Sequence, residues 1–235
     1  NAIIKIISDQ DFTDELKVSK VEGATSFEQK DNQLSIILKE EVAKDKIAKV
    51  KVYYEGVPPT EDGEGGIKKG LIYSNHGKNK NPVIATVCYP EGASLWFPCK
   101  KGISDKSDSI YIDITIEDKK VEQIFINKKT KAEETKQMPV IAVSNGKLEG
   151  IKKVEGGKKQ YQWRHRHPIA PHHVLLAVSN FMKAESSFKG KGYEFPINFY
   201  LLPENLRKSS SMMRRIPEIM ACLTNTFGPY PYRDE

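Results

Sequence analysis

The sequence predicts an all-β domain followed by one short helix, and three observations support this fold class. The dominant period is two: Ile110 to Ile116 alternates without a break, which puts four isoleucines on one face of a strand. Turn signals such as Asn145-Gly146 and Gly156-Gly157 separate the apolar segments. After Pro203 the spacing of apolar residues changes to three and four, which is the period of a helix.

Strand candidates cover most of the chain before Pro203. Residues Ile47 to Tyr54 alternate in a similar way, and the pattern stops at Gly56. A turn is expected at Asp31-Asn32. The other candidates are short β-rich runs bounded by polar or turn residues: Ile3 to Ile7, Leu34 to Leu38, Val83 to Val87, Ile124 to Asn127, Val140 to Val143, Tyr161 to Arg166, Val174 to Val178 and Ile197 to Leu202.

The helix is predicted from one apolar stripe near the end of the chain. Pro217 is acceptable only in a first turn, so we expect the helix to begin near Ile216, and Gly228-Pro229 is a stop signal. Strands followed by a helix indicate a β domain over residues 1–202, with residues 203–235 as a linker and the first helix of a second domain. The stripe consists of Ile216, Ile219, Met220, Leu223 and Phe227.

Composition narrows the class of protein. The chain has 235 residues and a formal net charge of +6, but its lysines are spread over turn-like stretches, so no nucleic-acid partner is expected. No apolar run reaches the ~18 residues that span a bilayer.

The three cysteines cannot form a closed set of pairs and are expected as buried or free thiols. Asn1-Ala2 without an initiator methionine suggests a start inside a longer protein. The compartment stays open.

Four of the five histidines fall within nine residues: His165, His167, His172 and His173. Alternate residues of a strand share a face, so a metal site is one interpretation of this cluster. Because no carboxylate or thiolate lies close in sequence, a cationic, partly exposed strand and turn is favoured. The motif H-E-x-x-H of metallopeptidases is absent, as is a G-x-S-x-G nucleophile turn. From its chemistry alone, the chain therefore contains no catalytic centre.

Several unusual strings occur in one order along the chain, and together they resemble the amino-terminal domain of the aminopeptidase N family of zinc metallopeptidases, closest to its bacterial members. The resemblance covers nearly the whole chain. The strings are Gly92 to Cys99 (GASLWFPC), Asp105 to Ser109 (DKSDS), Val140 to Leu148 (VIAVSNGKL), Trp163, Pro168 to Pro171 (PIAP) and Phe227 to Tyr232 (FGPYPY).

The resemblance implies a saddle-shaped, mostly antiparallel β domain that lies against a catalytic domain. In the family that next domain carries a G-x-M-E-[NH] strand, then H-E-x-x-H and a downstream glutamate for zinc. None of these lies in this chain. The resemblance thus implies a non-catalytic domain of a zinc metallo-aminopeptidase that removes amino-terminal residues from peptides. Zinc and its ligands, the catalytic domain and the peptide substrate would all belong to the parent.

The resemblance also points to one loop as an edge of the substrate site. In the family a Gln or Glu some residues before the "FPC"-like string accepts hydrogen bonds from the substrate's free α-amine. Counting back places Tyr89 there, a departure from the family pattern, and Glu91 is the nearest carboxylate. The Tyr89-Pro90 bond is predicted to be cis, because relatives often have a cis peptide there. Four residues are expected to be structural: Trp96, Phe97, Cys99 and Trp163.

Two alternatives remain open at this stage. One is a carbohydrate- or protein-binding β-sandwich module of a larger surface protein, which would need an exposed aromatic platform or acidic loop clusters. The other is an inactive or leukotriene-hydrolase-like member of the same family, which only downstream sequence can separate from an aminopeptidase.

Overall fold

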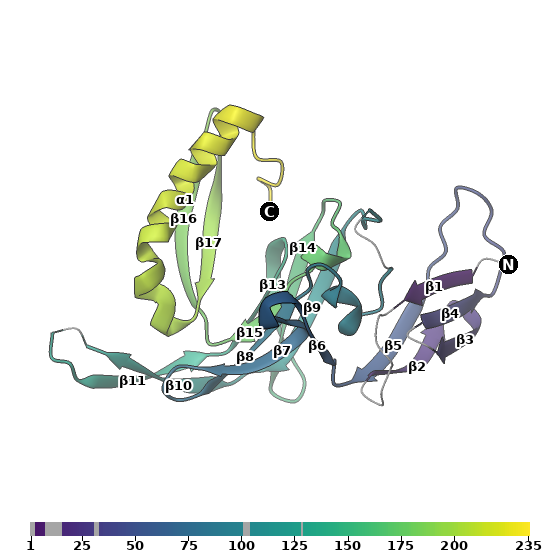
Figure 1. Cartoon of the computed structure of the whole chain (residues 1–235), viewed down its shortest axis with the longest axis horizontal. Coiled ribbons are helices and arrows are strands. Elements are labelled where there is room, and N and C mark those ends of the chain that lie inside the picture. Colours follow the sequence, from purple (N-terminus) through teal and green to yellow (C-terminus); the bar gives the residue numbers. More distant parts are fainter. Residues whose placement is uncertain (1–2, 8–15, 31–32, 101–103, 128) are drawn as a thin grey trace. The chain divides into compact units, whose positions relative to one another are not determined.

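The computed structural model describes residues 3–7, 16–30, 33–100, 104–127 and 129–235. Within them the chain is mostly β-strand and ends in one α-helix, which confirms the predicted fold class (Figure 1). Every strand pairing assigned there is antiparallel. The turn expected at Asp31-Asn32 and the residues Asn1-Ala2 lie outside the described residues.

The chain divides into two compact units, each made of three segments. The first unit comprises Asn1–Ile72, Thr86–Asp108 and Pro168–Leu175. The second unit comprises Tyr73–Ala85, Ser109–His167 and Leu176–Glu235.

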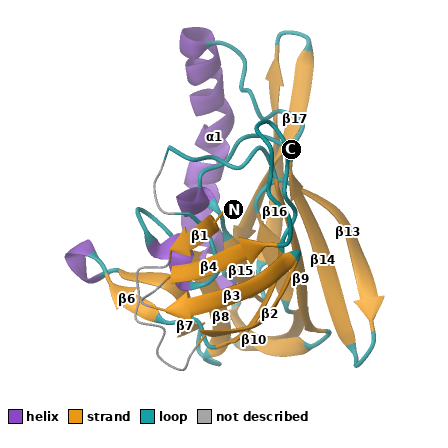
Figure 2. Ribbon diagram, turned by 90° about the vertical axis from the view of Figure 1, so that its right-hand side faces the viewer, coloured by secondary structure: helices purple, strands orange, loops and turns teal. Residues whose placement is uncertain are grey.

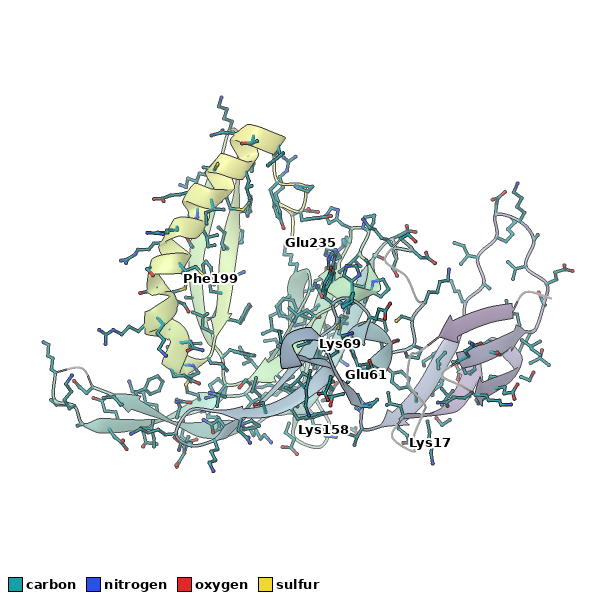
Figure 3. All side chains as sticks on the ribbon, in the orientation of Figure 1. Lys17, Glu61, Lys69, Lys158, Phe199 and Glu235 are labelled. Atoms are coloured by element: carbon teal, nitrogen blue, oxygen red, sulfur yellow. The ribbon has the colours of Figure 1, made fainter. Side chains whose placement is uncertain are left out.

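The first unit contains small antiparallel sheets. One sheet has the order β1 (Ile3–Ile7), β4 (Gln33–Leu38), β3 (Ala24–Lys30), and Leu34 and Ile36 of β4 are buried. Strand β2 (Leu16–Glu22) pairs with β5 (Lys51–Gly56). Strand β6 (Thr60–Asp62) pairs with the first residues of β7 (Lys68–His76), where Glu61 and Lys69 are cross-strand partners (Figure 3). Three 3₁₀ turns complete the unit: η1 (Glu64–Gly66), η2 (Gly92–Leu95) and η3 (Pro171–His173).

The strand expected over Ile47 to Tyr54 is shorter than predicted. It begins at Lys51, whose partner in β2 is Glu22. The next residue, Gly23, has a φ of +86°, a conformation outside the strand region, and β2 ends before it at Glu22. Ile47 consequently lies outside the strand with 89% of its surface exposed.

The described residues of the second unit contain a hydrophobic core. Strands β13 (Lys147–Val154), β14 (Lys158–His165) and β9 (Ile110–Glu117) form one sheet in that order. Strands β12 (Ile141–Ser144), β15 (Leu176–Ser179), β8 (Asn81–Val87) and β7 follow one another in a second sheet. The core that these strands share consists of Ile114, Val140, Ala142, Val143, Tyr161, Trp163 and Val178.

Two hairpins and the helix complete the second unit. Strands β10 (Lys120–Ile126) and β11 (Glu133–Pro139) form one hairpin, and β16 (Met182–Gly190) and β17 (Tyr193–Leu201) form the other. Helix α1 (Leu206–Phe227) follows the turn η4 (Pro203–Asn205) and runs beside the β16–β17 hairpin (Figures 1 and 2). No helix in the described part of the chain is long and apolar enough to cross a membrane.

The predicted start of the helix near Ile216 is wrong, because α1 begins ten residues earlier, at Leu206. Pro217 therefore lies inside the helix, where it removes one backbone hydrogen bond and crowds the carbonyl four residues before it. The upstream segment is helical all the same because α1 contacts β16 along the hairpin. Tertiary packing outweighs the local penalty of the proline.

Candidate functional site

The candidate site is the segment Cys88 to Cys99, which lies in the first unit and directly follows β8 in sequence. The Tyr89-Pro90 peptide bond is cis, as predicted. The chain then enters η2, whose four residues are all buried. The loop therefore consists of an exposed tip, Tyr89 to Glu91, on a buried base.

Hydrogen bonds to Cys88 hold the base of the loop. Its thiol donates to the carbonyl of Val174, which follows η3, at 3.3 Å. Its sulfur accepts the indole N–H of Trp96 at 3.2 Å. Its carbonyl accepts the amide of Gly92 at 2.8 Å, which closes the turn around the cis bond. These contacts close the segment on itself and connect it to Val174, so Tyr89 and Glu91 are flanked by groups held by hydrogen bonds.

Burial keeps both thiols of this segment in the neutral form. It raises the pKa of Cys88, and it raises the pKa of Cys99 to about 12, with a further contribution from the nearby Cys88. A neutral thiol is a poor nucleophile and a poor metal ligand. Trp96 and Phe97 are half-buried with ring centroids 4.7 Å apart, and the hydroxyl of Tyr54 donates to the carbonyl of Trp96 at 3.2 Å. These residues form part of the loop's supporting structure.

The two residues predicted to reach substrate are the exposed ones. Tyr89 has 72% of its surface exposed, and Glu91 is exposed beside it. The backbone carbonyl of Glu91 accepts the hydroxyl of Ser94 at 3.3 Å. Both residues therefore lie exposed in the same loop tip.

A neighbour of Tyr89 that sequence reasoning missed is His172. The two rings meet edge to face with centroids 5.7 Å apart, and the ring of His173 lies 4.1 Å further on. Burial lowers the pKa of His172, and the nearby His173 and Lys106 lower it further. A neutral imidazole beside an exposed tyrosine offers π surface and one lone pair. The local PHH sequence contains no signal of this contact, because Tyr89 is more than eighty residues away.

The histidine cluster of the sequence separates into two pairs, one in each unit. His165 and His167 lie in the second unit, where the carboxylates of Glu235 and Asp234 contact their rings. The separation from His167 Nε2 to Asp234 is 3.0 Å, and the ring of Tyr232 lies 4.9 Å from that of His167. Figure 3 marks Glu235 at this end of the chain. The histidines at 165 and 167 thus bind the carboxyl-terminal segment Tyr230 to Glu235.

The described residues do not form a zinc site. Across the described ranges, no group of three or more His, Cys, Asp or Glu side chains is arranged to hold a metal ion. No chemical step through a metal is therefore assigned to this chain.

Comparisons of the sequence with protein-family models and with curated proteins give no match. The structure does match solved structures. An M1 zinc metallopeptidase from Deinococcus radiodurans matches with a TM-score of 0.71 and 15% identity, over 98% of this chain and 46% of that one. A two-domain M1 zinc metallopeptidase mutant bound to L-arginine matches with a TM-score of 0.71 and 14% identity, over 98% and 47%.

The chain has a fold found in M1 zinc metallopeptidases. Aminopeptidase A of Legionella pneumophila, in complex with aspartic acid, gives a TM-score of 0.66 at 16% identity, over 98% of this chain and 24% of that one. At these identities the likeness to the M1 structures establishes the fold. This chain spans about half the length of the Deinococcus structure and about a quarter of the Legionella one.

Proposed function

We propose that this chain is the non-catalytic amino-terminal domain of a zinc metallo-aminopeptidase that removes amino-terminal residues from peptides. The observation that carries the proposal is the match of 98% of the chain to about half of a two-domain M1 zinc metallopeptidase. A domain of that kind would pack against a catalytic domain, which would provide the zinc. One solved neighbour is described as bound to a Tyr-Ser-Ala substrate, which supports a peptide as the substrate class.

The exposed tip at Tyr89 and Glu91 is proposed as this domain's edge of the substrate site. A carboxylate is the group that best accepts a charge-assisted hydrogen bond from a free α-ammonium, so Glu91 takes that role. The Tyr89 ring, next to neutral His172, would provide an apolar and π-rich wall for the first residue of the peptide. The buried base of the loop supports this role, since a recognition group must be held in place.

Residues 203–235 are proposed to be the linker and first helix of the catalytic domain. Helix α1 supports this, because four large apolar side chains on its surface remain exposed: Met212, Ile219, Leu223 and Phe227. A row of this kind is the expected surface for a partner domain.

The experiment uses the parent protein, which contains the sequence downstream of Glu235. The variant Glu91→Gln removes one charge at constant size, and Tyr89→Phe removes one hydroxyl. Glu155→Gln is the matched control, because Glu155 is exposed at the turn between β13 and β14.

We expect Glu91→Gln to lower kcat/KM for substrates with a free α-amine by about tenfold or more, which corresponds to the loss of one charge-assisted hydrogen bond. Zinc content should stay the same in all variants. The proposed edge is wrong if Glu91→Gln and Glu155→Gln have the same kcat/KM as the parent. The aminopeptidase assignment itself is wrong if the unmodified parent cleaves no such substrate.

A further inference from the structure

A network of polar side chains lies inside the second unit and is separate from the candidate site. His76, at the end of β7, has only 5% of its side chain exposed. Its Nδ1 lies 3.1 Å from each carboxylate oxygen of Glu204 in η4. Its Nε2 lies 2.7 Å from Oδ1 of Asn180 and 3.1 Å from Oγ of Ser179. Ser179 and Asn180 are almost completely buried.

Two backbone carbonyls fix the direction of the hydrogen bonds in this network, because a carbonyl can only accept. The carbonyl of Ile124 accepts from Nε2 of Gln123 at 3.2 Å, so the other end of that amide is its oxygen. The carbonyl of Glu122 accepts from Nδ2 of Asn81 at 2.8 Å, and the same nitrogen donates to Oε1 of Gln123 at 3.1 Å. Both contacts give Gln123 the same orientation.

The orientation of Gln123 determines that of Asn180. Oε1 of Gln123 lies 3.0 Å from the side-chain nitrogen of Asn180, which must donate to it. The oxygen of Asn180 therefore faces His76 and accepts from Nε2. On the opposite side of the ring, the carboxylate of Glu204 accepts from Nδ1. Both ring nitrogens face acceptors, and only the imidazolium form of histidine donates from both.

The side chain of Ser179 contacts His76, and that of His76 contacts Glu204, as in the series of contacts of a Ser-His-Glu hydrolase triad. The geometry nevertheless excludes that role in this fold. The hydroxyl of Ser179 donates to the carbonyl of Pro82 at 2.9 Å, so its proton is not directed at the histidine. Ser179 has no exposed surface, which leaves no room for a substrate carbonyl. The arrangement is instead a tether, that is, a set of hydrogen bonds that connects η4 to the ends of β7 and β15.

We propose that His76 is held as a buried imidazolium and that it fixes the start of α1 to the sheet of the second unit. Glu204 lies in η4 directly before α1, His76 is the last residue of β7, and Asn180 directly follows β15. Among the described residues, Glu204 is the charged group that faces His76, while Asn180 and Ser179 are neutral. Loss of one ring proton would set a nitrogen lone pair against an oxygen acceptor and weaken this connection.

Nitrogen NMR of the full chain tests the protonation state directly. Near about pH 7, where an ordinary histidine is mostly neutral, His76 should show two protonated ring nitrogens. His172 provides an internal reference, since its lowered pKa keeps it neutral with one protonated nitrogen. A His76 ring with one protonated nitrogen at this pH overturns the proposal. This measurement needs no variant and does not depend on a variant's folding.

Hydrogen exchange tests the tether. Glu204→Gln removes the charge at constant size, and Glu218→Gln is the control on the exposed surface of the same helix. We expect the amides of Ser210 to Met213 to exchange at least about tenfold faster in Glu204→Gln, as the loss of a charge-assisted bond predicts. In the control they should exchange as in the unmodified chain. Equal exchange in the two variants would show that the pair does not hold α1.

Discussion

At the scale of single residues, Gly92 determines the geometry of the candidate loop. A Cβ added there would lie 2.4 Å from the carbonyl oxygen of Val87 and 3.0 Å from the amide nitrogen of Gly70. Both neighbours are backbone atoms, so neither can rotate away. Any side chain at position 92 must therefore move the loop tip that presents Tyr89 and Glu91.

We predict that Gly92→Ala lowers the free energy of unfolding by about 1–3 kcal/mol, the usual cost of overpacking. Gly150→Ala is the matched control, because the nearest atom to its added Cβ is a flexible glutamine oxygen at 3.6 Å. Urea unfolding of both variants provides the measurement. Equal stabilities would show that the loop adjusts to a methyl group without strain.

The three thiols should react in the order of their exposure. Cys222 is exposed, whereas Cys88 is buried and Cys99 is half-buried, and burial raises the pKa of both of the latter. The thiolate is the reactive form. We predict that an aromatic disulfide reagent at neutral pH modifies one thiol of the native chain rapidly, and the other two only after unfolding. Rapid modification of Cys88 or Cys99, located by mass spectrometry, would contradict the buried base of the loop.

At the scale of elements, the residues of the apolar stripe of α1 lie in two different environments. Ile216 and Met220 line a cavity of about 400 Å³ together with Phe195 and Ile197 of the β16–β17 hairpin. Ile219 and Leu223 have 48% and 47% of their surfaces exposed. One side of the stripe is therefore half-buried and faces the hairpin within the second unit, and the other side is exposed.

We predict opposite results for two truncations in α1. Met220→Ala should lower the stability of the isolated chain by about 1–2 kcal/mol, since it removes packing against the hairpin. Leu223→Ala should change it by less than about 0.5 kcal/mol, as is usual for surface positions. Thermal unfolding compares the two. A larger loss for Leu223→Ala would mean that the exposed side of α1 is covered within the chain itself.

Local sequence patterns predicted those elements whose two faces differ most. Strand β9 alternates because Ile114 faces the core while Tyr111 faces solvent, so its bounds were close to correct. Strands β11 and β13 are rich in Lys and Glu and mostly exposed, and their pairing partners stabilise them without an apolar signal in the sequence. The Tyr89–His172 contact and the His76 network join residues far apart in the chain, which periodicity cannot reveal.

At the scale of the whole molecule, the described residues contain two compact units and a single long helix. The structural match covers 98% of the chain but only 46–47% of two M1 zinc metallopeptidase chains. About half of each of those two chains is matched by this one, and the other half is not part of the match. Under the proposed function, catalysis would take place in the parent's second domain.

The last prediction follows from this division. We predict that the chain alone has no peptidase activity and binds no stoichiometric zinc, whereas the parent has both properties. The reason is that H-E-x-x-H is absent from the sequence, and that His165 and His167 are engaged by the carboxylates of Glu235 and Asp234. Metal analysis of the purified chain after dialysis, together with assays on aminoacyl substrates, provides the measurement. One zinc per chain that disappears in the double variant His165→Ala, His167→Ala would contradict this reading and assign the histidine pair to a metal.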